Sequence, residues 1–319
     1  MSFIPVVATN PPSPRKGLTV TQQQRQALDE ILRHGPLDIG GEVTEQRAIF
    51  HEMIASAPLP DDVSAKQDEL GGVPVVIVET SQLDPSAVLL YLHGGAYALG
   101  SAPDSVGLAS DLARRVGARA ISVDYRLAPE HPFPAAVDDA VAAYRALLDQ
   151  GVPSSRIAFV GESAGGGLVA ATLVALKDAG VPLPSSAAVF SPWADLTVSG
   201  PSATGKAALD PALTPEALRT RARDYLGVRD PATPLASPIF ADLTGLPPLL
   251  IQVGSHEILL DDAVRLAARA GEHNVPVELQ VWPEVPHVFQ GFAAILDDAD
   301  QALNAAAAFI KRNWTGRSD

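Results

Sequence analysis

The most specific chemical signal in this 319-residue chain is a short run around one serine, Gly161-Glu162-Ser163-Ala164-Gly165. An apolar run typical of a strand precedes it and a helical pattern follows, which places Ser163 at the tip of a sharp strand-to-helix turn. Such a turn needs small residues on both sides of the serine, and glycine stands at 161 and 165. A serine held in this way attacks carbonyl carbons, and the Ala164 N–H at the start of the helix is placed to stabilise the resulting oxyanion.

A pair of glycines follows an earlier apolar run, Val88–Leu92, in the segment His93-Gly94-Gly95. Glycine lets a backbone approach a substrate closely and turn its N–H groups toward it. The segment begins at His93, 70 residues before Ser163 and one strand–helix–strand unit earlier in the chain. We therefore expect Gly94 and Gly95 to complete the oxyanion-binding donors, and we expect His93 to brace the loop rather than to react.

Three further motifs accompany these two: Asp124-Tyr-Arg-Leu-Ala-Pro-Glu-His-Pro-Phe-Pro134, Ser191-Pro-Trp-Ala-Asp-Leu-Thr197 and Leu246-Pro-Pro-Leu-Leu-Ile-Gln-Val-Gly254. In this order the set resembles the hormone-sensitive-lipase-like esterases, an α/β-hydrolase family, from about residue 60 to the end of the chain. The sequence departs from the family pattern at Ala96, where a third glycine is usual, and at Glu162, where aspartate is frequent. The resemblance implies an ester hydrolase that uses no cofactor.

A nucleophilic serine needs a base, and the base needs an orienting carboxylate. Of the seven histidines, His287 follows the last strand pattern in a loop, which fits the chain order serine, acid, histidine of this fold. The acid is expected after the preceding strand, where Glu257, Asp261 and Asp262 compete. The family pattern there resembles Asp-Pro-Leu-x-Asp-Glu, and its alignment puts Glu257 on the catalytic aspartate. Asp261 and Asp262 then open the next helix, where carboxylates suit the helix dipole.

Strand-like and helix-like segments alternate along most of the chain. A hairpin of 64–70 and 73–80 precedes strands at 88–92, 119–123, 157–160, 187–191, 249–253 and 277–282, with helices at 106–116, 135–148, 165–179, 215–225 and 261–270 between them. This order predicts an α/β-hydrolase fold with a mostly parallel, twisted central sheet and helices on both faces.

The remaining segments are expected to form a helical cap. We predict N-terminal cap helices within 1–60, at 21–32 and 44–56, and a catalytic domain over 61–319 that carries a cap insertion at about 193–238. Residues 1–17, rich in proline and polar side chains, are expected to lie loosely over the body. Asp138 and Asp139 are expected on the solvated face of their helix.

Composition limits the remaining functions. The chain is 47% hydrophobic, with 37 acidic and 23 basic residues and a formal charge of −14, which disfavours nucleic acid and anionic membranes as partners. The absence of cysteine excludes disulfides, thiolate metal sites and a cysteine nucleophile. No H-E-x-x-H motif or other metal-ligand spacing is present, so we expect neither a metal nor a cofactor. The N-terminus does not resemble a signal peptide, and we expect a cytoplasmic protein.

We therefore predict a carboxylesterase that cleaves short- to medium-chain esters through Ser163, His287 and Glu257. Its partner is a small ester, and a homodimer is the assembly that the sequence leaves open. One alternative is a lactone or acetyl-ester hydrolase with a specific metabolic substrate. Another is a non-catalytic module of the same fold that binds a small apolar ligand.

Overall fold

The computed structural model of the chain describes residues 19–55, 59–81 and 83–314. These residues form an eight-stranded sheet with the strand order β1-β2-β4-β3-β5-β6-β7-β8. The strands are β1 (Ser64–Leu70), β2 (Val73–Glu79), β3 (Asp84–Leu92), β4 (Ala118–Val123), β5 (Ile157–Glu162), β6 (Ser186–Phe190), β7 (Leu249–Gly254) and β8 (Val277–Trp282). Strands β3 to β8 pair in parallel, whereas β1 and β2 form an antiparallel hairpin at one edge. The predicted α/β-hydrolase fold is confirmed.

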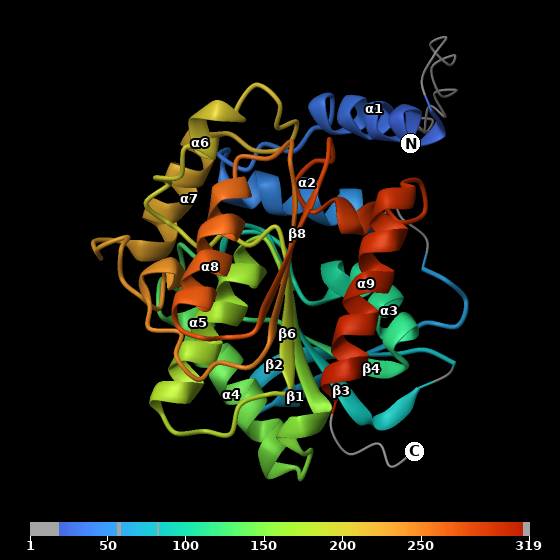
Figure 1. Cartoon of the computed structure of the whole chain (residues 1–319), viewed down its shortest axis with the longest axis vertical. Helices are drawn as coiled ribbons and strands as arrows, with labels where there is room; N and C mark the ends of the chain where they lie inside the picture. Colours follow the sequence, from blue (N-terminus) through green and yellow to red (C-terminus); the bar gives the residue numbers. More distant parts are fainter. Residues whose placement is uncertain (1–18, 56–58, 82, 315–319) are drawn as a thin grey trace.

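Helices cover both faces of the sheet (Figure 1). One face carries α3 (Val106–Val116) and α9 (Asp297–Asn313), and the other carries α4 (Ala135–Asp149), α5 (Ala164–Asp178) and α8 (Leu260–Glu272). The alternation along β3 follows from this arrangement. Val88, Leu90 and Leu92 join the core under α4, α5 and α8, whereas Leu89 and Tyr91 join the core under α3 and α9. A strand buried on both faces needs such a continuous apolar run.

Four further helices gather at one end of the molecule, near the carboxyl ends of the parallel strands (Figure 1). They are α1 (Val20–Arg33), α2 (Val43–Ala55), α6 (Ser202–Gly205) and α7 (Pro215–Leu226). Arginines on α1 and α2 anchor the N-terminal pair to three places on the body: Arg25 to Glu284 and Asp298, Arg33 to the Leu209 carbonyl, and Arg47 to the Ala98 and Ala128 carbonyls and to Glu130. That these helices act as a cap over a substrate stays a prediction.

The structure differs from the sequence expectations at two places. Helix α9 is not among the helices that the sequence pattern predicts, although its buried face carries Leu303, Phe309 and Ile310 beside four alanines. Asp139 is buried rather than solvated, since its carboxylate accepts hydrogen bonds from the Arg126 N–H at 2.8 Å and the Arg126 guanidinium at 2.7 Å. The expectations for residues 1–17, and for the end of the helix at 44–56, lie outside the described residues.

Gly165 allows the closest approach between β3 and the start of α5. A Cβ atom at this position would lie 2.0 Å from the Leu92 carbonyl oxygen and 2.4 Å from that of His93, both of which are rigid backbone atoms. Gly271 on α8 is exposed and has nothing within 4 Å of its Cβ position, which makes it a matched control.

We predict that Gly165→Ala lowers the free energy of unfolding by at least about 2–3 kcal/mol, because the methyl group forces the start of α5 away from the end of β3. Gly271→Ala should instead leave it unchanged or raise it by up to about 1 kcal/mol, since residue 271 lies in the last turn of α8, where the methyl group meets no other atom and restricts the unfolded chain. Urea denaturation followed by circular dichroism measures both values. Equal stability of the Gly165→Ala variant and the native chain would contradict this packing.

Candidate active site

Ser163 occupies a backbone conformation that is unusual for a serine, with φ 55° and ψ −122°. Hydrogen bonds from both directions hold it there: its N–H donates to the Phe190 carbonyl at 2.9 Å, and its own carbonyl accepts the Trp193 N–H at 2.8 Å. A Cβ atom on Gly161 would lie 2.5 Å from the Gly165 carbonyl oxygen, so a side chain at 161 is excluded. The turn is therefore strained but fixed by its surroundings, as is typical of functional sites.

Ser163, His287 and Glu257, selected separately from the sequence, lie in one chain of hydrogen bonds. The Ser163 Oγ atom lies 2.9 Å from Nε2 of His287, and Nδ1 of His287 lies 2.7 Å from Oε2 of Glu257. The three residues follow β5, β8 and β7. Because the carboxyl ends of parallel strands meet at one edge of a sheet, three segments distant in sequence converge there.

Both oxygens of the Glu257 carboxylate have partners, although its side chain is fully buried. Oε2 faces His287, while Oε1 accepts hydrogen bonds from the Ser191 hydroxyl at 2.7 Å and from the Gly254 N–H at 2.6 Å. The Ser191 Oγ atom in turn accepts the Val288 N–H at 3.1 Å, next to His287. Ser191 thus fixes both the carboxylate and the histidine loop. The sequence showed Ser191 as part of a family motif but indicated no role for it.

Three carboxylates act on the His287 imidazole. Burial alone lowers the pKa of His287, but Glu257, followed by Asp210 and Glu162, raises it, and the net shift is upward. Asp210 comes from the insertion and is itself buried; its carboxylate accepts the Ile258 N–H at 2.8 Å. Burial raises the pKa of Asp210 above its ordinary value. The site is therefore arranged to stabilise a positive charge on His287.

The glycine loop differs in one respect from the expectation. The Gly94 N–H donates to Oε1 of Glu162 at 2.7 Å, so this donor is already engaged and does not point to an open site. In the described chain the N–H groups of Gly95, Ala96 and Ala164 make no hydrogen bond. Gly95 has φ 109° and Ala96 has φ 54°, so the loop turns sharply after Gly94. On this loop the N–H groups without an acceptor are therefore those of Gly95 and Ala96, whereas the sequence pointed to Gly94 and Gly95.

His93 braces this loop, as expected. Its ring is buried and stacks on Tyr125 with centroids 4.2 Å apart, and the Tyr125 hydroxyl donates to the His93 carbonyl at 2.7 Å. The Nδ1 atom of His93 lies 2.7 Å from the Gly94 carbonyl oxygen, and burial lowers the pKa of the ring. His93 is therefore a neutral structural group in the loop.

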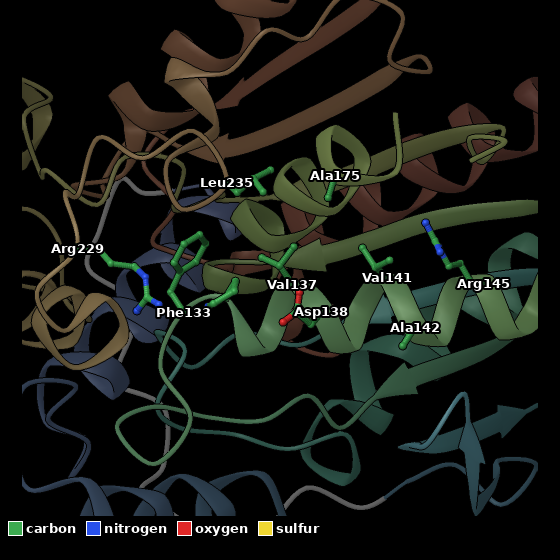
Figure 2. A pocket seen from close by; sticks show the side chains of 10 residues that line it. Phe133, Val137, Asp138, Val141, Ala142, Arg145, Ala175, Arg229 and Leu235 are labelled. Atoms are coloured by element: carbon green, nitrogen blue, oxygen red, sulfur yellow. The ribbon is translucent and has the colours of Figure 1, made fainter. Parts of the chain in front are cut away.

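A groove of about 590 Å³ lies along α4 (Figure 2). Its lining comprises Phe133, Pro134, Val137, Asp138, Val141, Ala142, Arg145, Ala175, Arg229 and Leu235. None of the three hydrogen-bonded residues contributes to it, so the groove and the triad are separate features. Within the part of the chain that the structure describes, no group of three or more histidine, aspartate or glutamate side chains is arranged to hold a metal ion.

Comparison with known proteins shows the family to which the chain belongs. Residues 89–291 match the family described as the alpha/beta hydrolase fold. An acetyl-hydrolase of Streptomyces hygroscopicus is 51% identical over 223 residues, which cover 70% of this chain and 75% of the relative. An esterase of Acinetobacter venetianus is 37% identical over 82% of this chain and 87% of its own length.

Among solved structures, an esterase from the bacterial hormone-sensitive lipase family superposes with a TM-score of 0.88 at 43% identity. The match covers 91% of this chain and 98% of the esterase. The chain belongs to this esterase family. Both departures from the family pattern, Ala96 and Glu162, lie on the loop and turn described above, beside the hydrogen-bonded triad.

We predict that Glu257→Gln lowers the pKa of His287, because the imidazolium loses its nearest negative charge. Asp261→Asn is the matched control, since that carboxylate instead accepts the Ser202 N–H at 2.5 Å and should leave the His287 pKa unchanged. NMR titration of the His287 ring measures both variants. An unchanged pKa in Glu257→Gln, or equal shifts in the two variants, would contradict the assigned geometry.

Proposed function

We propose that the protein hydrolyses short- to medium-chain carboxylic esters through an acyl-enzyme formed on Ser163. The observation that carries the proposal is the unbroken chain from Ser163 Oγ to His287 to Glu257, with distances of 2.9 and 2.7 Å. A serine hydroxyl becomes an effective nucleophile when a positioned base takes its proton, and the carboxylate holds that base in the correct tautomer.

In the proposed mechanism, Ser163 Oγ attacks the ester carbonyl carbon while its proton passes to Nε2 of His287. Glu257 accepts the Nδ1–H hydrogen bond and stabilises the imidazolium. His287 then gives the proton to the leaving alkoxide oxygen, and the alcohol departs from the acyl-enzyme. A water molecule, deprotonated by His287, attacks the acyl carbon, and return of the proton to Ser163 Oγ releases the carboxylic acid.

The tetrahedral intermediate carries a negatively charged oxygen that hydrogen-bond donors must stabilise. We assign this role to the N–H groups of Gly95, Ala96 and Ala164, because these groups have no acceptor within the described chain. Removal of one such donor costs roughly 3–4 kcal/mol of transition-state stabilisation in other enzymes. Ala164 is also the first residue of α5, so the positive end of the helix dipole lies at the same place.

The chain is a serine ester hydrolase, and small esters are its substrates. The preference for short acyl chains is the finer proposal. The relative named acetyl-hydrolase supports it, and so does an acidic chain with a formal charge of −14, which has no evident attraction to an anionic lipid interface. Within this range we therefore propose acetyl esters as the preferred substrates.

Location and assembly are also proposals. In the described residues no helix combines the length and the apolar character needed to cross a bilayer. A cytoplasmic location rests on the sequence alone. A homodimer is supported by β8, an edge strand of the sheet that exposes Leu279 and Val281. Edge strands of this kind pair readily with a second copy.

We predict that Ser163→Ala and His287→Ala each lower kcat by about a thousandfold or more, because only the oxyanion donors and substrate binding then remain. His34→Ala is the control, since that side chain is exposed directly after the end of α1 and its removal should leave kcat unchanged. Steady-state hydrolysis of an activated acetate ester measures all three, with circular dichroism to establish folding. Near-normal turnover by a folded Ser163→Ala variant contradicts the mechanism.

The acyl-chain preference has its own test. We expect kcat/KM to be highest for acyl groups of about two to eight carbons and to fall for longer chains, and we expect no increase in rate when the substrate forms an emulsion. A series of p-nitrophenyl esters from acetate to palmitate, with tributyrin and triolein emulsions, measures both effects. Efficient cleavage of emulsified triolein would contradict the proposed preference.

A further inference from the structure

Glu162, the residue before the nucleophile, is half-buried, and its carboxylate meets the glycine loop. Its Oε1 atom accepts the Gly94 N–H at 2.7 Å, and the buried Tyr91 hydroxyl faces the same carboxylate. The family frequently has the shorter aspartate here. Glu162 therefore joins the end of β5 to the loop after β3 through a single side chain.

This contact fixes the loop at the point where it meets the nucleophile. A Cβ atom built on Gly94 would lie 3.3 Å from Glu162 Oε1 and 3.3 Å from the Ser163 Cβ atom, so the loop passes directly over Ser163. The donors assigned to the oxyanion, on Gly95 and Ala96, follow immediately in the chain. A shift of the Gly94 N–H therefore moves both donors relative to Ser163.

We propose that Glu162 is a positioning residue: by accepting the Gly94 N–H, its ionised carboxylate holds the glycine loop so that the next two N–H groups meet the oxyanion. The proposal rests on the proposed ester hydrolysis by Ser163. It deepens that function, because it links one protonation state of Glu162 to an assembled oxyanion site.

The charged and titratable groups that face Glu162 come from three elements. Tyr91 on β3 carries a buried hydroxyl that faces the Glu162 carboxylate, Tyr125 follows β4, and His287 follows β8. Burial raises the pKa of Glu162 to about 7, and the Tyr91 hydroxyl, the Gly94 N–H and the His287 charge oppose this rise only in part. The carboxylate therefore titrates in the neutral range, where the enzyme is expected to work.

The direction of the pH effect follows from these contacts. As the pH falls through about 7, Glu162 takes up a proton and the charge-assisted hydrogen bond to Gly94 weakens. His287 loses its function as a base when it is protonated, so two ionisations depress kcat/KM on the acidic side. Protonation of Glu162 should therefore add a fall of about tenfold to the fall that protonation of His287 causes, and kcat/KM should drop more steeply near pH 7 than a single ionisation allows.

Stability should respond in the opposite direction. A carboxyl group with a raised pKa stabilises the folded state fully below its unfolded pKa, and this stabilisation is lost as the pH rises through about 7. At pH 8 the buried charge is a cost to folding, and Glu162→Gln removes it. This variant should therefore unfold at the same temperature as the native chain or higher, while its activity is lower.

The experiment compares pH profiles of kcat/KM, from pH 5 to 9, for the native enzyme, Glu162→Gln, Glu162→Leu and Asp210→Asn. Glutamine keeps a neutral acceptor for Gly94, and leucine removes the acceptor. Asp210→Asn is the matched control, because it removes a carboxylate that also acts on His287 but does not touch the glycine loop. Melting temperatures at pH 8 show that each variant is folded.

We expect Glu162→Gln to lower kcat/KM about tenfold at pH 8, mainly through kcat, and to remove the additional fall near pH 7, so that one ionisation describes its acidic limb. Glu162→Leu, where it folds, should lower kcat/KM further. Asp210→Asn should shift the midpoint of the acidic limb and keep the additional fall. Native rates and an unchanged acidic limb in Glu162→Gln would overturn the proposal, as would identical profiles for Glu162→Gln and Asp210→Asn. An active Ser163→Ala enzyme would instead overturn the proposed function, whichever result Glu162 gives.

Discussion

The close approach of the β5–α5 turn to the carboxyl end of β3 determines how the nucleophile and the loop beside it are held. A side chain at Gly165 would overlap the carbonyl oxygens of Leu92 and His93, and a side chain at Gly161 would overlap the Gly165 carbonyl. Because these positions carry no Cβ, the chain turns within a few residues from strand to helix and holds Ser163 at φ 55°. The same proximity brings the glycine loop over the serine. Nucleophile and oxyanion donors therefore share one structural cause.

The second organising feature is the concentration of buried carboxylates around one imidazole. Glu257 contacts His287 directly, and Asp210 and Glu162 act on it from the insertion and from β5. Buried carboxylates are costly unless they are hydrogen-bonded, and backbone N–H groups serve all three: Gly254 for Glu257, Ile258 for Asp210 and Gly94 for Glu162. The negative charge of these carboxylates stabilises the imidazolium that forms when Ser163 attacks the ester. Burying them costs folding free energy, but the same charges lower the barrier to the reaction.

The sequence predicted those parts of the site that depend on local pattern and chain order. Ser163 lies in a local motif. The order of strands pointed to His287 and to three competing carboxylates, and the resemblance to the family pattern selected Glu257 among them. No local pattern in the sequence indicates which groups on different strands contact one another. The hydrogen bond from Gly94 to Glu162 joins residues 68 positions apart, and burial of Asp139 depends on Arg126 folding back onto α4. Ser191 stood in a recognised motif, but its role appears only when β6, β7 and β8 lie side by side.

The central claim is that Ser163 forms the covalent acyl intermediate, and reaction with a fluorophosphonate ester tests it most directly. Such a probe reacts with a serine whose proton is removed by a base and whose tetrahedral adduct is stabilised by oxyanion donors. Intact-mass and peptide mass spectrometry should show one adduct per chain, located on Ser163, together with complete loss of esterase activity. An adduct on another residue, or persistent hydrolysis by fully labelled enzyme, would contradict the account.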